Sequence, residues 1–76
     1  MLSKLTDKEK EVYNLLISKL SIKQIAQKLG VKEATIKTQR SNIYEKLNYS
    51  DRLELVIDYY EQKLQMLRQF ILDKGL

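Results

Sequence analysis

One stretch of the chain, residues 33–47, carries the side chains best suited to a binding task. On a helical wheel with Ile36 at the origin, Ile43 and Leu47 fall within about 20° of it. The opposite stripe, from about 100° to 200°, holds small or hydrogen-bonding side chains, namely Ala34, Lys37, Thr38, Ser41 and Glu45. A DNA major groove, about 12 Å wide, admits one such helix. We predict base contacts from Lys37, Thr38 and Ser41; an ordinary solvated helix face is the alternative.

The composition excludes several other kinds of chemistry. The 76 residues contain no Cys and no His, so neither a disulfide framework, a Cys/His zinc site nor a histidine base is available. Two separate glycines cannot build a phosphate-binding loop. No pattern places the ten carboxylates with a base, a nucleophile or a metal-ligand set. We therefore expect no enzymatic activity, no metal and no cofactor.

The first two helices are predicted from capping motifs at their N-termini. Thr6-x-x-Glu9 and Ser21-x-x-Gln24 are capping boxes, in which each side chain bonds to the other residue's backbone N–H. The first box predicts a helix over about residues 7–18. The second predicts a short helix ending at Gly30, because glycine adopts the left-handed conformation at low cost.

Two further helices follow. The third is expected over about 33–47, and the fourth from Ser50-Asp51 to Asp73 or Lys74, with Gly75 as its stop. Many helix formers and no Pro support an all-α fold. The expected core residues recur at helical spacing. They are Val12, Leu15, Leu16, Ile25, Leu29, Ile36, Ile43 and Leu47.

Positive charge is concentrated in the first part of the chain. Residues 1–50 hold ten Lys and Arg against five Asp and Glu, whereas residues 51–76 hold four against five. The basic part includes two helices joined by a three-residue turn that contains Gly30, which is the helix-turn-helix arrangement. Tyr13, Tyr44 and Tyr49 are not gathered on one face, so we expect partial burial rather than stacking on bases.

These residues resemble the LuxR/GerE family of bacterial transcription regulators over residues 5–58, in order and without gaps. The resemblance is carried by Leu5-Thr6-Asp7-Lys8-Glu9-Lys10-Glu11-Val12, Ser21-Ile22-Lys23-Gln24-Ile25-Ala26, Leu29-Gly30-Val31, Thr35-Ile36-Lys37, Ile43, Lys46-Leu47 and Arg52. It implies a four-helix domain whose third helix reads the major groove and whose fourth helix mediates dimerisation.

The resemblance also implies contacts for individual residues. By this resemblance, Lys37, Thr38 and Ser41 contact bases. Lys23, Thr35 and Lys46 contact phosphates. Arg40 is a further phosphate candidate. It lies only about 40° from the buried face, which leaves open that its stem packs along the core edge.

The chain departs from the family pattern at several positions. Lys32 stands where the family has Ser or Thr, so the third helix lacks its expected N-cap, at a cost of about 1 kcal/mol. Lys32 also brings another cation close to a phosphate. Ile22 replaces an Asn and removes a phosphate contact. Lys19 and Gln39 stand where the family has Gly and His. These changes leave the fold intact and put the usual operator sequence in doubt.

The last helix carries a second pattern, a seam of apolar residues spaced 4, 3, 4, 3 and 4 apart. The seam residues are Leu53, Ile57, Tyr60, Leu64, Leu67 and Ile71. A helix of this length would extend beyond so small a body, so we predict a homodimer through the seam. A parallel pair would set Lys63 against Arg68 of the second copy, and an antiparallel pair would set Glu61 against Arg68. This weakly favours the antiparallel direction.

Together these patterns predict one helix-turn-helix domain over residues 1–76, with a family-like core at 5–58 and a long last helix at 51–74. We expect a homodimeric regulator that binds double-stranded DNA at a two-fold-related site in the bacterial cytoplasm or nucleoid, without a membrane segment and without a receiver or ligand domain. The alternative is a module like region 4 of sigma factors, which binds RNA polymerase.

Overall fold

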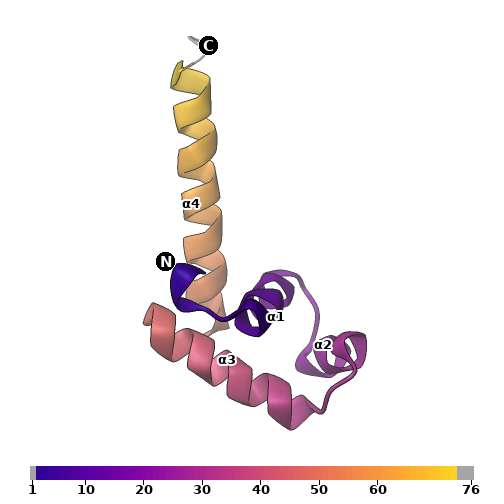
Figure 1. Cartoon of the computed structure of the whole chain (residues 1–76). Helices are drawn as coiled ribbons and strands as arrows, with labels where there is room; N and C mark the ends of the chain where they lie inside the picture. Colours follow the sequence, from indigo (N-terminus) through magenta and orange to yellow (C-terminus); the bar gives the residue numbers. More distant parts are fainter. Residues whose placement is uncertain (1, 74–76) are drawn as a thin grey trace.

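The computed structural model describes residues 2–73, and four α-helices account for most of them (Figure 1). A short 3-10 helix, Leu2–Lys4, precedes α1 (Asp7–Ile17), α2 (Ile22–Leu29), α3 (Glu33–Leu47) and α4 (Arg52–Asp73). No strand occurs within residues 2–73, so the all-α prediction is confirmed. The helix boundaries agree with the expected ones to within two residues. The expected stop at Gly75 lies outside the described residues, as does Lys74.

Both predicted capping boxes are present. The backbone N–H of Glu9 donates to Thr6 Oγ1 over 3.1 Å, and the N–H of Thr6 donates to Glu9 Oε1 over 2.9 Å. Ser21 and Gln24 repeat this exchange at 3.1 and 2.8 Å. Each box satisfies two N–H groups that a helix start would otherwise leave without a partner, which explains why α1 and α2 begin where they do.

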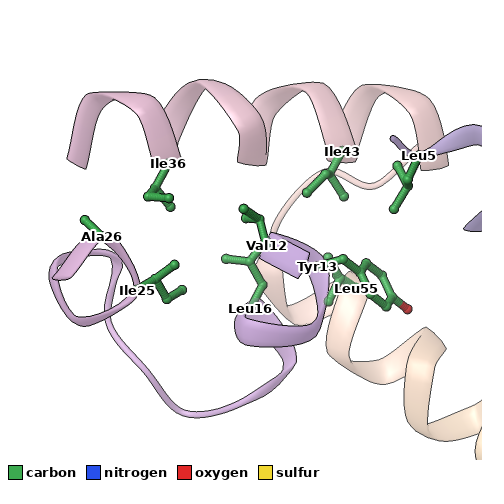
Figure 2. Close-up of a cluster of buried hydrophobic side chains, with 9 residues drawn as sticks. All are labelled: Leu5, Val12, Tyr13, Leu16, Ile25, Ala26, Ile36, Ile43 and Leu55. Carbon is green, nitrogen blue, oxygen red and sulfur yellow. The ribbon is translucent and has the colours of Figure 1, made fainter. Parts of the chain in front are cut away.

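The core lies where α1, α2 and α3 meet (Figure 2). Five of the expected core residues are fully buried, namely Val12, Leu16, Ile25, Ile36 and Ile43. The other three, Leu15, Leu29 and Leu47, are half-buried and pack against this cluster. Four residues outside the expected set complete the core: Leu5, Tyr13, Ala26 and Leu55.

Helix α4 packs on α1 through its first turns and then leaves the body (Figure 1). Leu55 is fully buried, whereas every residue from Tyr60 to Asp73 is exposed. The result is an elongated molecule of 48 × 22 × 21 Å. The seam is therefore not folded over α1, and its six side chains are 39–65% exposed.

Candidate nucleic-acid interface

Helix α3 presents its polar stripe to solvent because its apolar stripe is held by α1 and α2. Ile36 and Ile43 are fully buried, and Figure 2 shows both side chains pointing from α3 into the core. The five residues of the opposite stripe are all exposed: Ala34, Lys37, Thr38, Ser41 and Glu45. The structure thus brings the three predicted base-contacting residues together on one open helix face.

The turn between α2 and α3 sets the direction of this face. Gly30 has a left-handed backbone with φ of 68°, and the N–H of Val31 donates to the carbonyl of Ala26 over 3.0 Å. This hydrogen bond closes the end of α2 and starts the chain towards α3. A short turn ending in this way is what holds the second helix of a helix-turn-helix clear of the first.

The start of α3 lacks a side-chain cap. Lys32 occupies the N-cap position, and its side chain makes no capping hydrogen bond to any residue that the structure describes. The missing N-cap expected from a lysine at this position is therefore confirmed. The backbone N–H groups of the first turn of α3 and the exposed ammonium of Lys32 share this helix start with one carboxylate, that of the exposed Glu33.

The residues expected to contact phosphates differ in their surroundings. Lys23, Lys32 and Thr35 are exposed, whereas Arg40 is half-buried. The ammonium of Lys46 lies 2.6 Å from Glu9 Oε1, and 38% of the Lys46 side chain remains exposed. Lys46 thus already has one anionic partner within the protein, which the sequence did not indicate.

Glu9 is the acidic side of this ion pair. It is 6% exposed, and its Oε1 also accepts the N–H of Thr6. The Lys46 ammonium, followed by the Thr6 N–H, holds the pKa of Glu9 below its usual range. One carboxylate therefore caps α1 and connects it to the end of α3.

Arg52 is one of the residues that carry the family resemblance, and the structure assigns it a role. Its guanidinium donates to the carbonyls of Leu16, Ser18 and Leu20 over 2.8, 2.8 and 2.7 Å. These carbonyls belong to the end of α1 and the loop after it, where helical partners run out. Arg52 therefore fixes the root of α4 against α1, close to the helix-turn-helix.

The three tyrosines expected to be partly buried, Tyr13, Tyr44 and Tyr49, are all at least half-buried. Tyr13 is 4% exposed, and Tyr44 and Tyr49 are half-buried. Tyr49 donates a hydrogen bond to Asp58 Oδ2, and burial together with this carboxylate raises the pKa of Tyr49. The hydroxyl of Tyr44 is buried without a partner among the described residues. These rings stabilise the body and do not form a surface for stacking bases.

Residues 2–73 offer neither a metal site nor a helix that could cross a membrane. No group of three or more acidic residues in that range could hold a metal ion. None of its helices is both long enough and apolar enough to cross a membrane.

Comparison of the sequence with known proteins identifies its family. The GerE family model, described as bacterial regulatory proteins of the luxR family, matches residues 3–58. The HTH-type transcriptional regulator MalT of Vibrio campbellii is 46% identical over 55 residues, which are 72% of this chain and 6% of that protein. The transcriptional regulatory protein DesR of Bacillus subtilis is 42% identical over 52 residues, 68% of this chain and 26% of DesR.

A shorter relative is covered over most of its length. The spore germination protein GerE of Bacillus subtilis is 35% identical over 54 residues, 71% of this chain and 73% of GerE. The fold and the open face of α3 define a helix-turn-helix domain. The chain belongs to the LuxR family of bacterial regulatory proteins, and its domain is the DNA-binding domain of that family of transcription regulators.

Proposed function

We propose that the chain is a homodimeric, sequence-specific regulator of transcription that binds double-stranded DNA at a two-fold-related site. The observation that carries this proposal is the open stripe of α3, where Lys37, Thr38 and Ser41 are exposed opposite two fully buried isoleucines. Side chains of this size allow the helix to approach base edges, and all three can form hydrogen bonds there.

Phosphate contacts would come from residues around this stripe. Lys23, Lys32 and Thr35 are exposed, so they are open to the DNA backbone, and Arg40 would reach it with the end of a partly packed side chain. Lys46 can keep its ion pair with Glu9 and still donate a hydrogen bond to a phosphate, because an ammonium has three N–H donors. These contacts would supply most of the affinity and a strong dependence on salt.

The seam of α4 supports the homodimer. Six apolar side chains at heptad spacing are exposed along this helix, and a second copy would cover them. A two-fold dimer places two α3 helices in related positions, so the expected DNA site is an inverted repeat.

The experiment is selection from a random duplex DNA library at about 150 mM salt, where non-specific phosphate binding is weakened. Recovery of an inverted repeat is the expected result. Recovery of a single asymmetric element would contradict the two-fold site, and recovery of nothing above background would contradict sequence-specific binding. Co-purification with core RNA polymerase without DNA would then favour the sigma-like alternative.

A further inference from the structure

Two hollows flank the first half of the α4 seam, one on each side. The apolar hollow lies between the end of α1 and α4 and is lined chiefly by Ile17, Leu53, Val56 and Tyr60. The acidic hollow lies between the end of α3 and α4, and its charged lining residues are Glu54, Asp58 and Glu61. The root of α4 therefore offers an apolar side and an acidic side.

The second half of α4 carries matching side chains on the same two sides of the seam. Phe70 lies two heptads after Val56, so it projects from the side of α4 that faces the apolar hollow. Arg68 lies two heptads after Glu54, on the side of the acidic hollow. Both belong to the exposed part of the helix, and Phe70 is 55% exposed.

The seam has the same spacing when read in either direction. In an antiparallel pair centred on Gln62, Leu53 faces Ile71, Ile57 faces Leu67 and Tyr60 faces Leu64 of the second copy. All six seam residues then have a seam partner. In antiparallel coils, residues on one side of the seam meet residues on that same side of the other helix.

We propose that α4 pairs antiparallel in this register, with Phe70 of each copy seated in the partner's apolar hollow and Arg68 beside the partner's acidic hollow. The inference rests on the proposed homodimer and specifies its geometry. Phe70 falls within about 3 Å of the partner's Val56 along the helix axis, and Arg68 within about 3 Å of the partner's Glu54. Arg68 is about 7.5 Å along the axis from the partner's Glu61, so Glu54 is its nearer partner in this register.

The charges at the centre of the pair fit this register. Lys63 lies close to the two-fold axis, but its Nζ is 5.4 Å from the centroid of the Tyr59 ring and donates to the Tyr59 hydroxyl over 3.2 Å. The ammonium is therefore turned towards its own helix and away from the seam. A parallel pair would bring Lys63 near Arg68 of the second copy and leave each hollow without the other copy's Phe70.

Spin labels test the direction, and the absence of cysteine makes single-cysteine variants of the full chain clean probes. Gln62→Cys measures pairing, because the distance between its two labels is set only by the width of the helix pair in either direction. Leu72→Cys measures direction, because an antiparallel pair separates its labels by about 30 Å along the axis and a parallel pair sets them side by side.

The outcomes separate this inference from the homodimer on which it rests. A short Gln62 distance with a long Leu72 distance is expected. Short distances at both positions would overturn the antiparallel register and leave the homodimer standing. No short distance at Gln62 would overturn this register, and a monomer by sedimentation equilibrium of the same variant would overturn the α4 homodimer as well.

A second pair of variants tests the apolar hollow. Phe70→Ser should raise the dimer dissociation constant about tenfold, because aromatic anchors seated in pockets carry much of the energy of an interface. Met66→Ser is the matched control, since Met66 is 74% exposed on the same helix and projects away from the seam; it should change the constant by less than about twofold. Sedimentation equilibrium measures both constants. Equal effects of the two substitutions would overturn the assignment of Phe70.

Discussion

The carboxylate of Glu9 joins two helices that are far apart in the sequence. Its Oε1 accepts both the N–H of Thr6 at the start of α1 and the ammonium of Lys46 near the end of α3. Because both partners prefer the ionised form, they lower the pKa of Glu9 in the folded protein. The ionised carboxylate therefore stabilises the fold, and protonation removes that stabilisation.

The pH dependence of stability follows from the lowered pKa of Glu9. The stabilisation is fully present above the ordinary glutamate pKa of about 4.3 and is lost as the pH falls through the lower value of the folded state. We expect Glu9→Gln to be less stable than the wild type at pH 6 and to lose less stability on acidification. Urea unfolding between about pH 6 and 2.5 measures this. Parallel losses in the two proteins would contradict the assigned role of Glu9.

Lys37 is the residue on which the base-reading proposal can be tested most directly. Lys37→Ala should weaken specific DNA binding by about 1–3 kcal/mol and relax the preference at one base position. The control is Lys10→Ala, which removes the same charge from an exposed position on α1. Binding of both variants to the selected duplex and to single-base variants of it would be compared by fluorescence anisotropy. Equal affinities of the Lys37 variant and the wild type would contradict the contact.

At the scale of the helices, the N-termini of α2 and α3 differ in how their first backbone N–H groups are capped. The Ser21 side chain caps α2. The Lys32 side chain, at the N-cap of α3, makes no capping hydrogen bond to any described residue. Lys32→Ser should therefore stabilise the fold by about 1 kcal/mol, measured by urea unfolding. It should also reduce the salt dependence of DNA binding if Lys32 contacts a phosphate. An unchanged unfolding free energy would show that the missing cap is already compensated.

The turn between α2 and α3 depends on the left-handed backbone of Gly30. A Cβ added at Gly30 meets no atom within 4 Å, so the cost of Gly30→Ala is conformational strain and not a clash. That strain is about 1 kcal/mol. Asn48 ends α3 with φ of 61°, so Asn48→Gly is the matched change in the opposite direction and should not destabilise the protein. Thermal unfolding of the two variants measures both changes in stability. Destabilisation by Asn48→Gly would contradict this account.

Helix ends could be predicted from the sequence because their determinants are local. The two capping boxes join residues three positions apart, and Gly30 acts through its own backbone. The stripe of α3 also follows from spacing within one helix, and its exposure is confirmed. The contacts of the stripe with bases stay a prediction.

Interactions between distant residues could not be predicted in the same way. Lys46 meets Glu9 across 37 positions, and Arg52 meets Leu16 across 36, so their pairing depends on how the helices pack. The same limit applies to Leu55. Heptad spacing places Leu53 on the seam, but only the position of α1 decides that Leu55, two residues later, is fully buried.

At the scale of the whole molecule, the proposed DNA-reading face and the seam proposed to pair occupy different parts of the chain. Helix α3 lies in the body with α1 and α2, whereas the second half of α4 extends away from it (Figure 1). Leu64 and Leu67 are 56% and 55% exposed, so replacing them should leave the core unchanged. Substitutions in the seam can therefore test the proposed pairing without altering the proposed DNA-reading face.

The double variant Leu64→Glu, Leu67→Glu tests this separation. It places two carboxylates in the seam, where burial against a second copy would require removing them from water. We expect sedimentation velocity to show a dimer for the wild type and a monomer with unchanged helix content for the variant. Binding to an inverted repeat should fall towards the affinity for a single half-site, since each α3 then binds alone. If wild type and variant both sediment as monomers, the seam is not an interface between two copies.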